Sequence, residues 1–151
     1  MSFSWTRCVG FDSTNKMCPP RNFHTTNVVG DNIFIIGGTS GQKFFADVKK
    51  IKLKDLNGDA STPRWDIPSL HQGPSMPVVD GSIFAGRSRH TAVTIGTNIY
   101  VFGGVKGGDD LYRLDTTLEP LIWDKVAVNG RAPSSRLGHT ATSIGANMYI
   151  F

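Results

Sequence analysis

The sequence predicts an all-β fold in which a four-stranded unit is repeated. Two observations lead to this prediction. The pattern Arg-x-x-His-Thr, followed by two apolar runs with a glycine turn between them, occurs at three places in the 151 residues. Within these runs the residues are apolar or alternate with polar ones, as in buried or half-buried strands, and no segment convincingly predicts a helix.

The composition suits a folded protein with many turns. Hydrophobic residues make up 39% of the sequence, which also contains 17 glycines and 8 prolines. The net charge of +4 favours acidic partners through electrostatic steering. The densest basic cluster, at residues 49–54, alternates lysines with Ile51 and Leu53, which is typical of a strand with a solvated face. We therefore expect no nucleic-acid partner.

The first two strands of each unit, strands a and b, follow a histidine. The three histidines lie 66 and 49 residues apart, and each has an arginine three residues before it. They are His24, His90 and His139. A Gly-x-Asn turn separates the two apolar runs, and both Gly and Asn tolerate the positive φ that tight hairpins need. A Gly-Gly pair ends strand b at residues 37–38 and 103–104. Each copy is therefore predicted to form a β-hairpin.

The next two strands, c and d, come from the segments after the glycines. Residues 47–51 align with residues 110–114, and a tryptophan follows each segment, at Trp65 and Trp123. Trp5 precedes the first histidine as Trp65 precedes the second. We expect a tryptophan to open each d strand and to pack between neighbouring sheets.

Four short strands that recur at roughly 50 residues are typical of a β-propeller, in which each sheet is one blade. The segments RSRHT, YVFGG and DLYRLD and the tryptophan after them, within residues 87–123, closely resemble the kelch motif. The resemblance covers nearly the whole chain. It implies a kelch-type propeller fragment with about two and a half to three four-stranded blades, arranged as an open arc rather than a closed ring.

The repeat also predicts how the chain is divided. Residues 1–18 are expected to supply the final strand of a preceding blade, 19–85 a first full blade with long insertions, 86–132 a second full blade, and 133–151 the first hairpin of a third. The spacing of 14 residues from histidine to second glycine places the next Gly-Gly pair at 152 and 153, so a chain truncated in mid-blade is expected. Its open blade edges are expected to self-associate.

The loops at one end of the blades are the predicted recognition surface. In an up-and-down blade the b–c and d–a connections emerge on the same face. The long d–a connection, residues 66–87, then shares that face with the b–c loops 39–46 and 105–110. Residues 78–84 predict a small hairpin within it. Loops on a rigid scaffold commonly carry function, so we expect a protein partner to bind here.

Eight residues of these loops are candidates for partner binding. They are Lys43, Phe44, Phe45, His71, Val79, Phe84, Lys106 and Asp109. A structural interpretation of the apolar ones stays open, because such side chains also pin loops to the edge of a blade.

The repeated polar residues and glycines are predicted to be structural. The histidines occupy the same place in different blades, so no metal cluster is expected, and the arginines are expected to bond to backbone carbonyls. The Gly-Gly pairs lack the lysine motif and the helix of a phosphate site. The pair Asp109-Asp110 suits turn chemistry better than cation binding. We expect no catalytic residue, cofactor or metal, and therefore no enzyme.

The resemblance implies a scaffold or adaptor role, for example in cytoskeletal organisation, cell polarity or ubiquitin ligation. The alternative is a propeller domain of a larger enzyme, such as a kelch-bearing phosphatase, whose active site lies outside this fragment. The sequence has neither a signal peptide nor 18 consecutive apolar residues, so we expect a cytoplasmic protein with free thiols and no membrane partner. A disulfide between Cys8 and Cys18 would need an oxidising compartment.

Overall fold

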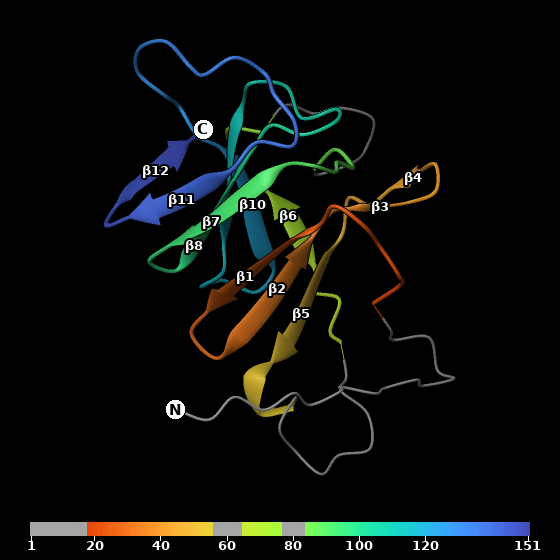
Figure 1. Cartoon of the computed structure of the whole chain (residues 1–151). Coiled ribbons are helices and arrows are strands. Elements are labelled where there is room, and N and C mark those ends of the chain that lie inside the picture. The colour runs from red at the N-terminus through yellow and green to blue at the C-terminus, as the bar shows by residue number, and fades with distance from the viewer. Residues whose placement is uncertain (1–17, 56–64, 77–83) are drawn as a thin grey trace, which may run out of the picture.

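The computed structural model describes residues 18–55, 65–76 and 84–151 (Figure 1). The prediction of an all-β fold is confirmed, since the described residues contain no α-helix and only one short 3-10 turn, Leu53–Asp55. None of the helical segments in these ranges is long and apolar enough to cross a membrane. Trp5, Cys8 and Val79, and all of the predicted hairpin 78–84 except Phe84, lie outside the described residues.

The first sheet contains three antiparallel strands. These are β1 (Thr25–Val29), β2 (Asn32–Ile36) and β5 (Val48–Lys52), in the order β1-β2-β5. The turn between β1 and β2 uses Gly30 at a φ of 54°, as the Gly-x-Asn pattern predicts. The fourth strand of this unit is reduced to one bridge, between Lys50 and Asp66. The described part of the first unit therefore lacks the full d strand that the sequence predicts after Trp65.

The second sheet has all four predicted strands and one more. Strands β7 (Thr91–Ile95), β8 (Asn98–Phe102), β9 (Leu111–Asp115) and β10 (Leu121–Lys125) form an antiparallel meander. The fifth strand, β6 (Leu70–Gln72), pairs in parallel with β10 at the outer edge. The interval 66–87 was predicted to be a connection, so β6 is a strand that the sequence analysis did not foresee.

Two hairpins complete the described structure. Strands β11 (Ala141–Ile144) and β12 (Asn147–Ile150) form the third sheet. Strands β3 (Thr39–Ser40) and β4 (Lys43–Phe44) form a small hairpin within the first b–c loop. In Figure 1 the three larger sheets lie side by side, with β1, β7 and β11 next to one another. They do not close into a ring, which confirms the predicted open arc.

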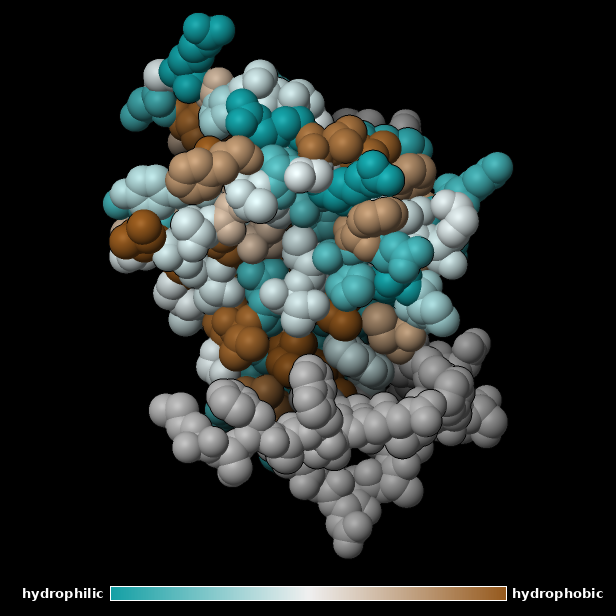
Figure 2. Space-filling model, in the orientation of Figure 1, coloured by the Kyte–Doolittle hydropathy of each residue, from teal (hydrophilic) through white to brown (hydrophobic). Residues whose placement is uncertain are grey.

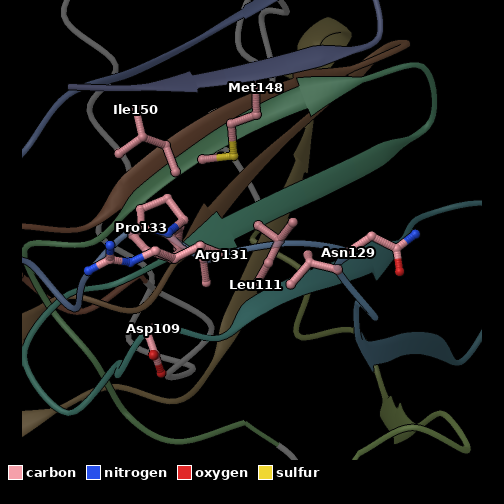
Figure 3. Close-up of a pocket in the computed structure, with 10 residues that line it drawn as sticks. Asp109, Leu111, Asn129, Arg131, Pro133, Met148 and Ile150 are labelled. Atoms are coloured by element: carbon pink, nitrogen blue, oxygen red, sulfur yellow. The ribbon is translucent and has the colours of Figure 1, made fainter.

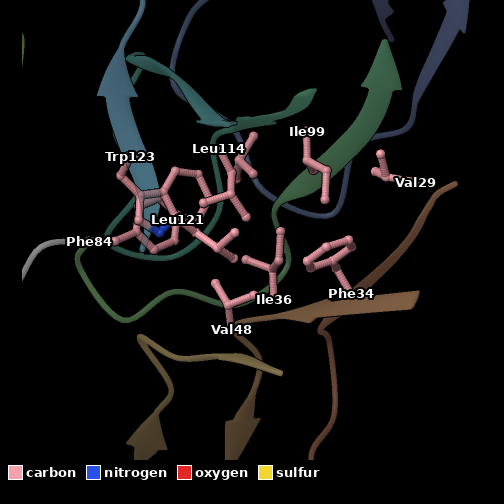
Figure 4. Packing of buried hydrophobic residues seen from close by; sticks show 10 residues of the cluster. Val29, Phe34, Ile36, Val48, Phe84, Ile99, Leu114, Leu121 and Trp123 are labelled. Carbon is pink, nitrogen blue, oxygen red and sulfur yellow. The ribbon is translucent and has the colours of Figure 1, made fainter. Parts of the chain in front are cut away.

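The main hydrophobic core lies between the first and second sheets (Figure 4). Ile36 and Val48 of the first sheet face Ile99 and Leu114 of the second, and all four are at most 1% exposed. Their alternate spacing along each strand is the pattern that the sequence shows. Full burial of each such side chain contributes about 1.5–3 kcal/mol, so this contact fixes how the two sheets pack.

Trp123 is the largest side chain in this core. It is 0% exposed, and the Phe84 ring stacks on it at 4.1 Å between centroids with an interplanar angle of 4°. The prediction that a tryptophan packs between sheets is therefore confirmed for Trp123. Trp65 is half-buried and lines a surface hollow with Lys50 and Glu119.

Candidate partner-binding face

The strand directions bring four described connections to one end of the sheets. The b–c connections 37–47 and 103–110 follow β2 and β8, and the d–a connections 84–90 and 126–140 precede β7 and β11. We call this end the loop face. In Figure 2 the tips of the β3–β4 hairpin and of the 126–140 connection are hydrophilic.

Each Gly-Gly pair lies against the start of the next sheet. A Cβ on Gly37 would lie 2.7 Å from the Arg87 carbonyl oxygen, and one on Gly103 would lie 2.5 Å from that of Arg136. The next glycine in each pair donates its N–H to the same carbonyl, over 2.8 Å from Gly38 and 2.9 Å from Gly104. The glycines thus allow two backbones to approach closely, which supports the structural role that the sequence predicts for them.

The histidines join neighbouring sheets through hydroxyl groups. His90 Nε2 lies 3.0 Å from Thr25 Oγ1, and His139 Nε2 lies 2.7 Å from Thr91 Oγ1. Each histidine therefore bonds to the threonine that follows the previous histidine in the repeat. Within the described ranges, no three His, Cys, Asp or Glu side chains are grouped so that they could hold a metal ion.

Burial keeps the imidazole of His90 neutral. The side chain is 5% exposed, and burial, with the positive charge of Arg87 as a second cause, lowers its pKa to about 3. The pKa of His139 is also lowered, mainly by burial and then by Arg136. A neutral imidazole suits a buried hydrogen bond between sheets, which is the contact that both histidines make.

The repeated arginines anchor the loops. Arg21 donates from Nη1 to the Gly37 carbonyl oxygen over 2.8 Å and to Asp47 over 2.6 Å. Arg87 is 1% exposed, and its guanidinium carbon lies 4.1 Å from the Phe84 ring centroid and 4.7 Å from that of Tyr112. The predicted bonding to backbone carbonyls is confirmed for all three arginines, since Arg87 donates to the Gly103 carbonyl oxygen over 3.5 Å and Arg136 to that of Ser134 over 3.1 Å. Arg87 adds cation–π stacking that the sequence did not indicate.

Three of the predicted site residues lie together on the loop face. Lys43 and Lys106 are exposed, and Phe44 is half-buried between the two b–c loops. Lys106 Nζ lies 4.9 Å from the centroid of the Phe44 ring. Phe45 lies beneath them, 7% exposed, with the Arg21 guanidinium over its ring at 4.1 Å. Phe45 therefore supports the face from below.

The other predicted residues lie elsewhere. Phe84 is 2% exposed and belongs to the core beside Trp123, so it fixes its loop in place. His71 is exposed on β6, opposite Ile122 at the outer edge of the second sheet. Asp109 is exposed in the second b–c loop and lines a hollow with Arg131. Val79 lies outside the described residues.

Sequence reasoning missed a pair of neighbouring side chains, one just before β1 and one just before β7. Phe23 and Arg89 immediately precede the first two histidines, and both have a φ of 57°. The Arg89 guanidinium carbon lies 4.5 Å from the centroid of the Phe23 ring, which is 52% exposed. The two residues between the repeated arginine and histidine differ among the three copies, and this variation was the available signal.

The exposed charges of the described loop face are mainly positive. Four cationic side chains are exposed on its connections, against one exposed carboxylate, that of Asp109. They are Lys43, Arg89, Lys106 and Arg131. Asp110 is bound to Lys125 at 2.8 Å, and Asp47 to Arg21. The face therefore offers cations beside aromatic rings to an approaching molecule.

Comparison with known proteins adds to this picture. Residues 74–151 match the family model described as the KLHDC2/KLHL20/DRC7 Kelch-repeats domain. The tRNA wybutosine-synthesizing protein 2/3/4 of Arabidopsis thaliana is 33% identical over 124 residues, which are 80% of this chain and 11% of that protein. The Rab9 effector protein with kelch motifs of Rattus norvegicus is 33% identical over 100 residues, 62% of this chain and 23% of that protein.

Kelch domain-containing protein 3 of Bos taurus is a further relative, 27% identical over 112 residues, which are 71% of this chain and 25% of that protein. The chain therefore spans between about a tenth and a quarter of the length of these relatives.

Proposed function

Because this chain belongs to the kelch-repeat family, we propose that it is a protein-interaction module whose loop face binds an acidic segment of a partner protein. Kelch domains generally bind proteins. The observation that carries the proposal is the group of exposed cations on the loop face, next to the Phe23 and Phe44 rings.

The support beneath the face favours binding over reaction. The histidines bond to neighbouring sheets, and the buried Arg87 packs against the Phe84 and Tyr112 rings, so the exposed residues stand on a scaffold with fixed geometry. Exposed lysines and arginines steer an acidic partner towards them, and aromatic rings supply contact area with few rotatable bonds. The name of the rat relative, an effector of Rab9, describes a protein that acts through another protein and supports a binding role here.

The proposal is tested with a short fluorescent peptide rich in glutamate and its glutamine counterpart. We expect the glutamate peptide to bind more tightly, and its affinity to fall between about 50 and about 200 mM NaCl as the charges are screened. Replacing both Lys43→Glu and Lys106→Glu is expected to weaken binding by about fivefold or more in fluorescence anisotropy.

The matched control is Lys52→Glu with Lys54→Glu. Both lysines are exposed at the opposite end of the first sheet, next to the turn after β5, and the net charge change is the same. Equal loss of binding in the two double variants would contradict a specific loop-face site. So would equal affinity for the glutamate and glutamine peptides, or stronger binding of a short single-stranded DNA.

An enzyme role was the alternative expected from the sequence, and one relative is named as a tRNA wybutosine-synthesizing protein. We propose that residues 1–151 contribute binding and not catalysis, and that they act in the cytoplasm. The repeated histidines support this proposal, because His90 and His139 bond to threonines of neighbouring sheets. Substrate turnover by the 151-residue chain, or its secretion with a Cys8–Cys18 disulfide, would contradict it.

A further inference from the structure

An asparagine followed by a glycine lies in the connection between the second and third sheets. Asn129 and Gly130 belong to residues 126–140, all of which the structure describes and none of which is in a helix or strand. Both residues are exposed. Figure 3 shows the Asn129 amide directed away from the other labelled residues, so water reaches this side chain.

This pair of residues favours one reaction of the backbone. The Gly130 nitrogen, once it has lost its proton, attacks the side-chain carbonyl carbon of Asn129, and the side-chain nitrogen takes up a proton and leaves as ammonia. The product is a five-membered succinimide ring. Water then opens the ring at either carbonyl and yields aspartate or isoaspartate. The net change replaces an amide with a carboxylate, and asparagine is one of the thermolabile residues of proteins for this reason.

The local structure leaves both reacting groups open. Glycine has no side chain to obstruct the approach of its nitrogen, and a Cβ built on Gly130 meets nothing within 4 Å. Within the described part of the chain, no hydrogen bond holds the Gly130 N–H or the Asn129 side chain. Neither group therefore has to break a bond to the rest of the fold before the ring closes.

The other described asparagines lack these features, because none of them precedes a glycine. Asn32 and Asn98, at the first two hairpin turns, are each followed by an isoleucine. These residues, Ile33 and Ile99, are paired with a neighbouring strand on both sides. A branched side chain beside the nitrogen and a backbone held in a sheet both oppose ring closure.

We propose that Asn129 deamidates, and that the new carboxylate lowers the affinity of the loop face for an acidic partner. The carboxylate lies two residues from Arg131, one of the exposed cations of that face. It joins Asp109 as a second exposed carboxylate there, so the attraction of an acidic segment weakens. The effect on binding rests on the proposed function, whereas the chemical change itself does not.

The first experiment follows the masses of peptides from the whole 151-residue chain. The chain is kept at physiological pH and temperature, samples are cut with trypsin, and the mass gain from amide to acid is measured. Trypsin cuts after lysine and arginine, which places Asn129, Asn98 and Asn57 in different peptides. Asn57 also precedes a glycine but lies outside the described residues, so it is followed separately. Asn129 is expected to deamidate at least about tenfold faster than Asn98, and faster as the pH rises.

A capped peptide with the sequence of residues 126–131 shows whether the fold protects the site. Because the structure leaves both reacting groups open, the rate in the folded chain is expected to lie within about fivefold of the rate in the peptide. A rate in the folded chain that is lower by more than this factor would overturn the site, since it would mean that the connection is held in a conformation that prevents the attack.

The second experiment measures binding of the glutamate peptide in fluorescence anisotropy. Asn129→Asp carries the charge of the product, whereas Asn129→Gln keeps an amide that would have to close a larger ring. Asn129→Asp is expected to bind at least about twofold more weakly than Asn129→Gln, and the difference is expected to shrink as salt is added. The matched control is Asn147→Asp, which makes the same charge change at an exposed hairpin turn away from the loop face and is expected to bind like the unaltered chain.

The outcomes separate the chemical change from its effect. Equal rates of deamidation at Asn129 and Asn98 would overturn the site, as would protection by the fold. Equal affinities of Asn129→Asp and Asn129→Gln would overturn the effect on the loop face. If Lys43→Glu with Lys106→Glu also left binding unchanged, the proposed function itself would fail.

Discussion

At the residue scale, His90 shows how one side chain joins two sheets. It bonds to Thr25 of the first sheet, and a Cβ added to Gly37 would lie 3.0 Å from its ring. Its position in the motif is explained by this contact, because the ring needs a glycine on the neighbouring strand and a hydroxyl within reach.

The buried imidazole predicts a pH dependence of stability. The pKa of His90 is about 3 in the fold and near 6.5 when unfolded, so the unfolded chain binds more protons between these values. The contribution of His90 to the free energy of unfolding is therefore fully present above about pH 6.5. It falls as the pH decreases, by up to about 1.4 kcal/mol per pH unit.

Urea unfolding between about pH 7 and about pH 5 checks this expectation. His90→Gln removes the titrating group and is expected to flatten the dependence. A pH-independent free energy of unfolding in the unaltered chain would show that the histidine is not buried as described.

Gly103 gives a second prediction at this scale. Its φ is 67°, and a Cβ would lie 2.5 Å from the Arg136 carbonyl oxygen, whereas at Gly96, with a φ of 60°, a Cβ meets nothing within 4 Å. Gly96→Ala is expected to cost about 1–2 kcal/mol for its backbone angle alone. Gly103→Ala carries that cost and a backbone clash, so a loss of about 3 kcal/mol or more is expected. Equal losses in thermal or urea unfolding would argue against the close contact between sheets.

At the element scale, the segment that leads into β7 is held by its aromatic residue. Phe84 stacks on Trp123 and meets the Tyr112 ring edge-on, with centroids 5.5 Å apart. Phe84→Ala is expected to destabilise the fold by about 3–5 kcal/mol in urea unfolding, because it leaves a cavity beside a fully buried tryptophan. Phe44→Ala is expected to cost much less, since Phe44 is half-buried. A larger loss of stability for Phe44→Ala than for Phe84→Ala would make Phe84 a candidate for partner binding again.

Elements whose own residues carry a turn or apolar pattern were predictable, and elements that form only by pairing with distant residues were not. The hairpins follow from the glycine turns and from the apolar runs beside them. Strand β6 has only three residues and pairs with a strand about fifty positions away, so neither its pattern nor its neighbours indicate it. The first d strand was expected by analogy with Trp123, but only the bridge at Asp66 forms among the described residues.

The candidate site shows the same division. Lys43, Phe44 and Lys106 were placed on one face by topology alone, and the structure brings them together. The sequence does not tell whether an apolar loop residue is buried or exposed. Phe44 and Phe84 are both phenylalanines in predicted loops, and only the packing around Trp123 shows that Phe84 belongs to the core. Arg89 and Phe23 were overlooked because the repeat was aligned on its constant residues, although a variable position in a fixed scaffold is where recognition can differ.

At the scale of the whole molecule, the described sheets differ in how many neighbours support them. The second sheet packs against the first through a core of fully buried side chains and contacts the third through β7. The third sheet has two strands, and several of its large apolar side chains are exposed, among them Ile144 at 62% and Tyr149 at 42%. Stability in a repeat protein is close to a sum of unit and interface contributions, so it is expected to be uneven along this chain.

Hydrogen exchange of the unliganded chain measures this difference directly. Amides of β8 next to Ile99 and Val101 are expected to exchange only through opening of the core, whereas those of β12 exchange through separation of the third hairpin, at least about tenfold faster. His139→Ala removes the bond to Thr91 Oγ1 and is expected to speed exchange in β11 and β12 without changing β2. Uniform protection across β2, β8 and β12 would mean that the three sheets unfold as one cooperative unit.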